Sequence, residues 1–328
     1  MTWKMLAPAL ILAFAAGAVT AEPPPGWQRE WPGTDFTRTL VDFAEIRSGG
    51  PPKDGIPSID EPAFARVDAI TDLAPTEPVM SVRLGDDARA YPLRILMWHE
   101  IVNDAVDGLP IAVTYCPLCN SGVVFERTVA GTPTTFGTTG KLRHSDLVMY
   151  DRASESWWQQ FDGRAIVGAH AGTELARVPA RLEAFADFAE RHPEGLVLVP
   201  NEARLRDYGR NPYVGYDTAA RPFLFDGIYD GPGSPLMRVV VVDGLARAYS
   251  LERLRRDGEV VDPPFVIRWR PGQSSALDTP QIDRGRDVGT VTVQRQDARG
   301  TLHDAVYDVP FAFALRAFRP DIPIHHVE

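Results

Sequence analysis

The chain has 328 residues, of which 44% are hydrophobic and 24% are charged, and its formal net charge at pH 7 is −10. This composition is that of a globular protein with ample material for a core, and it excludes a fibrous or low-complexity chain. The acidic balance argues against a nucleic-acid partner or an anionic membrane surface, because both carry negative charge.

The first 21 residues have the pattern of a Sec-type signal peptide. Lys4 precedes an apolar run, which ends in the small residues of Val19-Thr20-Ala21. The run is too short to span a bilayer, and no second run of membrane length follows. We therefore expect export to the periplasm or the extracellular space, with cleavage after residue 21 and no membrane span.

The mature chain is predicted to consist of a lead-in, residues 22–48, and a single domain, residues 49–328. Residues 49–58 are dense in Gly and Pro, which excludes a helix or a central strand and predicts a loop that is either packed against the body or a simple linker. Beyond this loop, hydrophobic periodicity and turn residues predict the elements in chain order. The pattern predicts strands at 79–84, 88–91, 111–115, 147–150 and 196–199, a hairpin of 122–127 with 134–137, and helices at 92–101 and 182–191.

Residues 207–229 contain four tyrosines but are interrupted by Gly and Pro, so they are predicted to be an ordered aromatic loop. Taken together, these elements predict an α+β fold that is strand-rich and mainly antiparallel.

The sequence also predicts a degenerate internal repeat, with related halves at approximately 79–160 and 236–315. Arg89-Ala90-Tyr91-Pro92-Leu93 recurs as Arg247-Ala248-Tyr249-Ser250-Leu251, each after a Val-bearing strand and before a Leu-bearing helix. The alignment places Arg270 at the position of Cys116, Gln273 at that of Cys119 and Asp257 at that of His99. One copy would then make the same turn without cysteine.

Cys116 and Cys119 are the only cysteines, and they lie in a Cys-Pro-Leu-Cys turn directly after the predicted strand 111–115. A pair at this spacing forms a small disulfide, binds a metal ion through two thiolates, or acts as a redox couple. A thioredoxin-like centre has a helix after the first cysteine, whose N-terminus stabilises the thiolate. Here a turn and a strand are predicted instead.

A metal site at this turn needs further ligands, because the chain has no second cysteine pair. His99 is the first candidate, since it lies on the predicted helix immediately before the strand that leads to Cys116. His144 and Met149 are secondary candidates. Two thiolates with His or Met suit a soft ion such as copper(I), with zinc second.

Three functions therefore remain open. The protein binds a soft metal, or it carries out thiol redox chemistry with Cys116 and Cys119 as catalytic residues, or it is a non-enzymatic binding or scaffold module with a structural Cys116–Cys119 disulfide. Its partner would be a metal, a small molecule or a redox protein, and the sequence does not decide whether it is an enzyme. Asp146, Asp151 and Asp162 would serve a hydrolase as acids or bases, although a strand-rich surface also needs such residues for solubility.

These blocks together resemble an exported family catalogued as a domain of unknown function, DUF3179. The resemblance rests on the 49–57 loop, on Trp98-His99-Glu100, on Tyr115-Cys116-Pro117-Leu118-Cys119, on Ser145-Asp146-Leu147 and on the segment from Tyr208 to Tyr216. It implies export and a cysteine turn set among aromatic and acidic blocks, and it brings no established reaction. The family pattern has Asn where this chain has His144, which implies that His144 is not an essential ligand.

Overall fold

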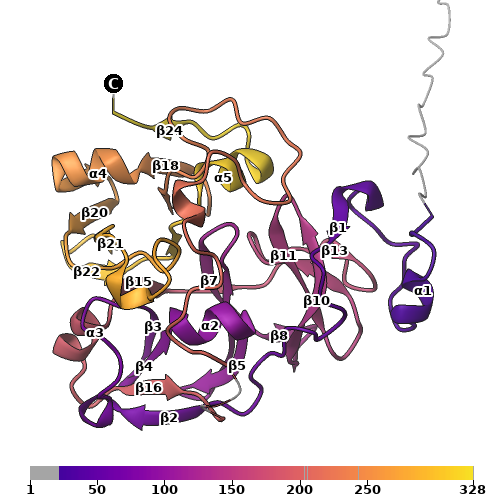
Figure 1. Cartoon of the computed structure of the whole chain (residues 1–328), viewed down its shortest axis with the longest axis horizontal. Coiled ribbons are helices and arrows are strands. Elements are labelled where there is room, and N and C mark those ends of the chain that lie inside the picture. Colours follow the sequence, from indigo (N-terminus) through magenta and orange to yellow (C-terminus); the bar gives the residue numbers. More distant parts are fainter. Residues whose placement is uncertain (1–21, 203, 205, 243, 328) are drawn as a thin grey trace, which may run out of the picture.

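The structure is a computed structural model that describes residues 22–202, 204, 206–242 and 244–327 (Figure 1). The expected signal peptide lies outside the described residues. Strands predominate, and nearly all of them pair antiparallel, which confirms the predicted fold class. In the part of the chain that is described, no helix has both the length and the apolar character needed to cross a membrane.

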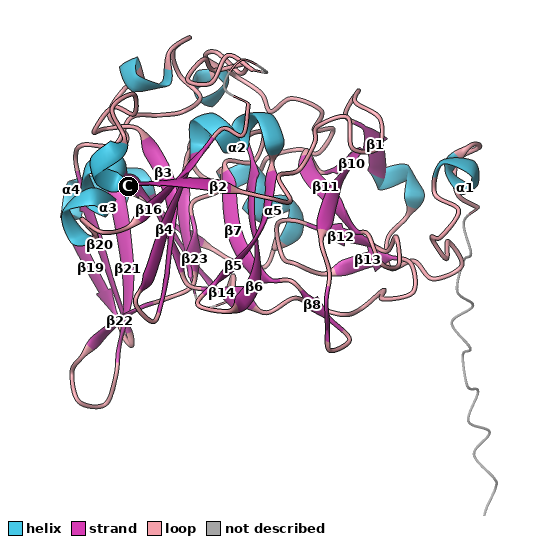
Figure 2. Cartoon of the chain, turned by 90° about the horizontal axis from the view of Figure 1, so that it is seen from below, coloured by secondary structure: helices cyan, strands magenta, loops and turns pink. Residues whose placement is uncertain are grey.

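Five sheets are arranged like blades around an axis (Figures 1 and 2). The strands of each sheet are given in their order across that sheet. The first sheet contains β1 (Ile46–Ser48), β10 (Phe136–Arg143), β11 (Asp146–Asp151), β12 (Trp157–Gln159) and β13 (Ala165–Val167). The second contains β14 (Arg177–Val178), β7 (Ser121–Glu126), β6 (Leu109–Cys116) and β5 (Ile101–Val106). The third contains β15 (Ala180–Ala184), β3 (Pro78–Leu84), β4 (Asp87–Pro92), β16 (Leu196–Val199) and β2 (Ala63–Arg66).

The fourth sheet contains β23 (Tyr307–Asp308), β17 (Val239–Val242), β18 (Arg247–Ser250) and β24 (Ile324–His325). The fifth contains β19 (Glu259–Asp262), β20 (Phe265–Arg270), β21 (Thr290–Gln296) and β22 (Leu302–Asp304). A two-stranded ribbon joins β8 (Thr128–Val129) to β9 (Thr132–Pro133). The α-helices are α1 (Trp27–Glu30), α2 (Leu93–His99), α3 (Phe185–Arg191), α4 (Leu251–Asp257) and α5 (Ala312–Phe318).

The internal repeat is confirmed by the order and pairing of the elements. The series β3-β4-α2-β5-β6-β7 in the first copy corresponds to β17-β18-α4-β19-β20-β21 in the second. The series β14-β15-α3-β16 likewise corresponds to β22-β23-α5-β24, and the parallel pair of β4 with β16 has its counterpart in β18 with β24. The sequence comparison ended at 160 and 315, whereas this correspondence extends to Val199 and His325.

A buried hydrogen bond recurs between the copies and supports their common origin. The Tyr91 hydroxyl donates to Asp104 at 2.6 Å, and the Tyr249 hydroxyl donates to Asp262. An arginine two residues before each tyrosine pairs with the same aspartate, because alternate strand residues share a face. The conserved geometry shows that each β-β-α-β unit folds in the same way.

The two copies differ at two connections, and both differences bear on the cysteines. The first copy inserts residues 127–176 between β7 and β14, and this insertion forms β8 to β13. The second copy has residues 271–289 between β20 and β21, where the first has only residues 117–120. Cys116 and Arg270 do end equivalent strands, but the expectation that the second copy makes the same turn is wrong.

Two further predictions are corrected by the strand pairing. Residues 182–184 belong to β15, which pairs with β3, so the helix predicted at 182–191 begins only at Phe185. Residues 122–127 and 134–137 share only one backbone hydrogen bond, from the Thr134 amide to the Arg127 carbonyl at 2.9 Å, because β7 pairs with β6 and β14 while β10 pairs with β11 and β1. The predicted turn at Ala130-Gly131 does occur, within the β8–β9 ribbon.

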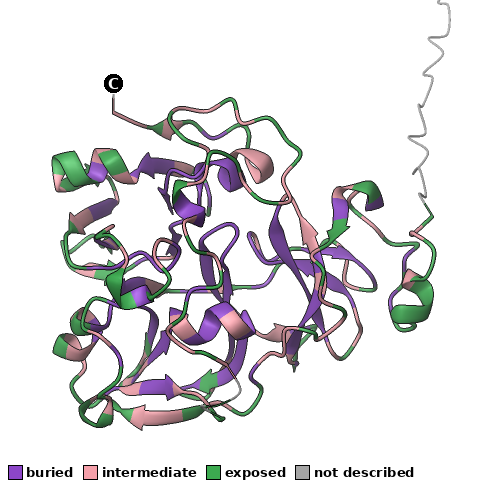
Figure 3. Cartoon of the chain, viewed as in Figure 1, coloured by how far each residue is buried: buried purple, intermediate pink, exposed green. Residues whose placement is uncertain are grey.

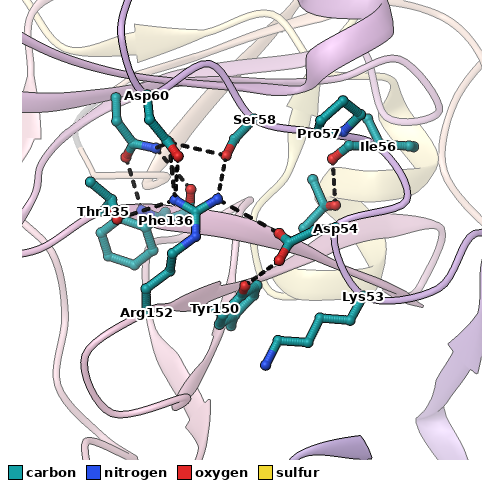
Figure 4. Close-up of polar contacts among 12 residues, drawn as sticks. Lys53, Asp54, Ile56, Pro57, Ser58, Asp60, Thr135, Phe136, Tyr150 and Arg152 are labelled. Carbon is teal, nitrogen blue, oxygen red and sulfur yellow. Dashed lines mark hydrogen bonds and ion pairs between the residues drawn. The ribbon is translucent and has the colours of Figure 1, made fainter.

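The loop at residues 49–60 packs against the insertion, which is one of the two alternatives that the sequence leaves open (Figure 4). The Tyr150 hydroxyl donates to Asp54 at 2.5 Å. Arg152 donates to Ser58 at 2.8 Å and to Asp60 at 3.0 Å. Asp60 also accepts from the Asn103 amide on β5 at 2.7 Å, so the loop ties the insertion sheet to the sheet that carries the cysteines.

Candidate functional site

The Cys-Pro-Leu-Cys turn joins β6 to β7 in the buried middle of the molecule (Figure 3). The Cys119 amide donates to the Cys116 carbonyl at 3.3 Å. Asn120 completes the turn with a φ of 51°, and its side chain donates to the Val309 carbonyl at 2.7 Å. Both sulfurs face one acceptor, because the Ser145 carbonyl oxygen lies 3.7 Å from Cys116 Sγ and 3.3 Å from Cys119 Sγ.

Cys116 and Cys119 are free thiols with relative exposures of 1% and 0%. Burial raises the pKa of both thiols, since a thiolate is poorly solvated there. A redox catalyst needs an accessible sulfur with a lowered pKa. Neither condition is met in this structure, and the disulfide of the scaffold hypothesis is also absent from it.

Asp146 is the third potential ligand at this site. A ligand atom of Asp146 and the two sulfurs all lie within 4.8 Å of one another. Asp146 begins β11, directly after the two-residue turn His144-Ser145 that follows β10. The first copy of the repeat therefore supplies the cysteines, and its insertion supplies the carboxylate.

The Asp146 carboxyl group is held in one orientation by the strand end that faces it. Its Oδ2 accepts from Gln159 Nε2 at 2.6 Å and from the Phe161 amide at 3.0 Å. The Cys119 thiol also interacts with this carboxyl group, but the geometry gives the buried Oδ1 no hydrogen-bond partner among the described residues. Burial raises the pKa of Asp146 to about 7. A buried carboxylate oxygen without a partner is unfavourable unless a proton or a cation satisfies it.

Glu100 adds a second buried carboxyl group beside this cluster. Burial, with a smaller contribution from the Asp146 charge, raises the pKa of Glu100 to about 8. Glu100 caps α2 with a φ of 58°, whereas the corresponding cap of α4 is Gly258, with a φ of 71°. A glycine adopts this conformation more easily than a glutamate does. The first copy thus keeps a glutamate where the backbone favours glycine.

Strained backbone is concentrated around the site. Of the ten described non-glycine residues with positive φ, four surround the cysteines: Glu100, Asn120, His144 and Ser145. Such conformations are sparsely populated and persist where the surroundings enforce them, and they gather at functional sites. The distribution of positive-φ residues therefore supports a functional site at the cysteine turn.

The aromatic loop predicted at 207–229 covers the cysteine turn. The Tyr216 hydroxyl donates to the Leu118 carbonyl at 2.9 Å, and the Ser145 hydroxyl donates to the Phe223 carbonyl at 2.5 Å. Tyr213 lies close enough for the charges of Glu100 and Cys116 to help raise its pKa, after burial as the main cause. The loop thus contacts both the cysteine turn and the hairpin that carries Asp146.

His99 does not belong to the group of potential ligands that the structure brings together. Its Nδ1 lies 2.7 Å from the Pro57 carbonyl oxygen and its Nε2 lies 2.8 Å from the Tyr208 hydroxyl. Since a carbonyl only accepts, Nδ1 carries the proton and Nε2 accepts from tyrosine. Burial lowers the pKa of His99, in keeping with a neutral ring.

The secondary candidates occupy different surroundings. His144 Nε2 lies 3.3 Å from Glu45, and its ring packs edge-on against Phe318. Met149 is fully buried in β11, among the apolar side chains of the main core. Its role as a ligand stays a prediction.

Asp146 and Glu100 are the residues that sequence reasoning undervalued. Asp146 was grouped with acids that serve solubility, but it is fully buried. The Ser145-Asp146-Leu147 block of the family resemblance was the available signal. Glu100 was part of the Trp98-His99-Glu100 block, but sequence alone did not separate it from its histidine neighbour.

Comparison with known proteins identifies a family without a described activity. No curated protein and no solved structure is significantly similar to the chain. Residues 53–322 match the family described as "Protein of unknown function (DUF3179)". Because this match covers most of the chain, including the cysteine turn and the Asp146 hairpin, the protein belongs to the DUF3179 family.

Proposed function

We propose that this is an exported metal-binding protein in which Cys116, Cys119 and Asp146 hold one transition-metal ion. One observation carries the proposal: two sulfurs and a carboxylate oxygen from separate elements lie within 4.8 Å of one another in a buried site. The partnerless Oδ1 of Asp146 supports it, because a cation would satisfy that oxygen.

The donor set favours zinc over copper. Copper(I) prefers thiolate, thioether and imidazole ligands, which fitted the sequence prediction with His99 as the third ligand. Zinc accepts carboxylate oxygen together with sulfur and takes four donors in structural sites. Glu100 lies outside the group of ligand atoms within 4.8 Å of one another, but it is our candidate for the fourth donor, since the charge of Asp146 acts on Glu100 and the charge of Glu100 acts on Cys116.

Metal binding also fits export better than free thiols do. Outside the cytosol an unprotected pair of neighbouring thiols tends to oxidise. A bound ion keeps both sulfurs as thiolates and protects them. Burial of both sulfurs argues against thiol exchange with a protein partner, so redox catalysis is the weaker alternative. A scaffold with a structural Cys116–Cys119 disulfide is compatible with this burial and is the second candidate.

The test is metal analysis of the mature protein purified anaerobically from its export compartment. We expect about one zinc ion per chain in the wild type and little or none in Cys116→Ser and Asp146→Asn, because each removes a ligand. His99→Ala should retain the metal, since both of its ring nitrogens bond elsewhere.

Asp151→Asn is the matched control for Asp146→Asn. Asp151 is equally buried and ends the same strand, but it accepts from Ser154 and Trp158 instead. Loss of metal only in the Asp146 variant supports the proposal. A wild type without metal, or equal metal loss in the Asp146, Asp151 and His99 variants, would contradict it.

A further inference from the structure

A second pocket lies in the other copy of the repeat, between α4 and the 271–289 connection. Its cavity volume is about 260 Å³. Arginines from three separate elements line it: Arg238 before β17, Arg255 on α4 and Arg286 in the connection. This convergence of arginines is not used by the proposed metal site.

Arg238 forms the buried part of the pocket, with a relative exposure of 8%. Its Nη2 donates to Asp217 at 3.0 Å and to Ser275 at 2.8 Å. Within the described residues, no hydrogen bond is formed by its Nε or Nη1, although the guanidinium lies 5.7 Å from the Phe311 ring centre. A buried guanidinium with unused donors favours an anionic acceptor.

The two other arginines also have donors to spare. Arg286 uses Nη1 to bond Asp217 at 2.8 Å. Arg255 is exposed, and its only interaction with the described residues places its guanidinium 5.9 Å from the Trp269 ring centre. Its fork of N–H groups is therefore available to a ligand.

Two of the three acidic residues that line the pocket, Asp217 and Asp287, are already occupied. Both oxygens of Asp217 accept hydrogen bonds, from Arg286 at one and from Arg238 and Ser275 at the other. Both oxygens of Asp287 accept from the Gly272 amide at 3.0 Å. Glu252 lies 3.6 Å from His326 and is largely exposed. Unused donors therefore outnumber unused acceptors at the cavity.

We propose that this pocket binds a small organic anion through Arg238, Arg255 and Arg286. Arginine recognises carboxylate and phosphate groups through paired N–H donors, so the ligand class is a small carboxylic acid or a phosphate ester. The cavity is large enough for such a molecule but not for a folded partner. This binding does not depend on the metal site.

The test is isothermal titration calorimetry of the mature protein with inorganic phosphate and, separately, succinate, at constant ionic strength. We expect saturable binding of at least one probe, and the probe that binds distinguishes the phosphate class from the carboxylate class. Arg255→Gln should weaken it about tenfold, as expected for the loss of a charge-assisted hydrogen bond.

Arg256→Gln is the control, because Arg256 lies on the same helix and pairs with Asp257 outside the pocket. Unchanged binding in this variant supports the site. Arg238→Lys tests the buried position, and it should weaken binding while the unfolding transition remains cooperative. Absence of binding of both probes at 10 mM, or equal weakening by the Arg255 and Arg256 variants, would overturn the proposal.

Discussion

His144 and Ser145 show how the site constrains individual residues. They form the two-residue turn between β10 and β11, with φ of 52° and 66°. Turns with two positive φ values favour Asn-Gly, because these residues tolerate that conformation. Ser145 nevertheless places its carbonyl against both sulfurs and its hydroxyl against Phe223. The turn therefore accepts strain to position polar groups.

His144→Asn should leave the metal content unchanged. Asparagine fits the left-handed conformation better, and this offsets the loss of the 3.3 Å contact with Glu45. We expect the free energy of unfolding to change by no more than about 0.5 kcal/mol. Chemical denaturation and metal analysis check this, and a variant that loses its metal would show that His144 is a ligand.

Asp308 predicts how stability depends on pH. It is buried and accepts from the Ser121 hydroxyl and the Gly122 amide, and burial raises its pKa from 3.8 to about 6. The folded state therefore binds the proton more tightly than the unfolded state. Its contribution to stability is highest below pH 4 and falls as pH rises toward 6.

Asp308→Asn should remove this dependence of stability on pH, because asparagine does not titrate. The hydrogen bonds can persist, since the amide NH₂ group donates to the Ser121 hydroxyl and the amide oxygen accepts from Gly122. The difference in free energy of unfolding, wild type minus variant, should fall between pH 4 and 6 by about 1.4 kcal/mol per unit of pKa shift. Urea titrations across this range measure it. A difference that rises with pH would contradict the assignment.

The end of α2 shows why the sequence favours His99 as a ligand over its neighbour Glu100. His99 and Glu100 are adjacent, and the sequence offered His99 because imidazole is a common metal ligand. The chain leaves α2 through a left-handed cap at Glu100, and the two side chains consequently have different surroundings. A glycine at the end of a helix pattern predicts a cap with positive φ, but here the capping residue is Glu100, so the sequence does not predict this cap.

The loop at 207–229 acts as a cover for the cysteine turn. It contains no β-strand in its described residues, and its contact with the turn depends on the hydrogen bond from Tyr216 to Leu118. Three of its apolar side chains, Val214, Phe223 and Ile228, are exposed. Its other aromatic side chains pack against the core, but no described strand includes its backbone, so it should open more readily than the sheets beneath it.

Tyr216→Phe should therefore make the metal-free thiols react several-fold faster with a maleimide reagent, since one bond of the cover is lost. Tyr229→Phe is the control, because Tyr229 is in the same loop but its hydroxyl donates to Pro232, just beyond the loop, and not to the cysteine turn. Equal labelling rates in the wild type and the Tyr216 variant would show that the loop does not control access.

The positions of the strands were predicted more accurately than the pairing between strands. The strands near 79–84 and 111–115 follow from hydrophobic patterning, and both occur. The partner of residues 122–127 did not follow, because a turn at Ala130-Gly131 is compatible with several pairings. The insertion carries β10 and β11 to another sheet, and this long-range choice depends on packing of side chains that local patterns do not specify. Asp146 was undervalued for the same reason.

The two copies of the repeat are interlocked. Asp308 of the second copy accepts from Ser121 and Gly122 of the first, and the Phe311 amide donates to the Cys119 carbonyl at 2.8 Å. In the other direction, the Ala184 amide of the first copy donates to Thr290 of the second at 3.2 Å. The second copy therefore holds the turn that carries the cysteines.

Neither half should fold alone. Residues 22–229 and 230–328 expressed separately would each leave buried polar groups without partners, and such groups are costly. We expect weak near-ultraviolet circular dichroism and no cooperative unfolding for either fragment alone. When the fragments are mixed, we expect a strong near-ultraviolet signal and a cooperative unfolding transition. A cooperative transition in an isolated fragment would show that the halves are independent domains.

The most direct test of the proposed function is X-ray absorption spectroscopy at the zinc edge on the mature, anaerobically purified protein. We predict two sulfur neighbours at about 2.3 Å and oxygen neighbours at about 2.0 to 2.2 Å, from Cys116, Cys119 and Asp146. The same measurement on Asp146→Asn should show weakened or absent metal. A sample without metal, or a shell that contains no sulfur, would contradict the account.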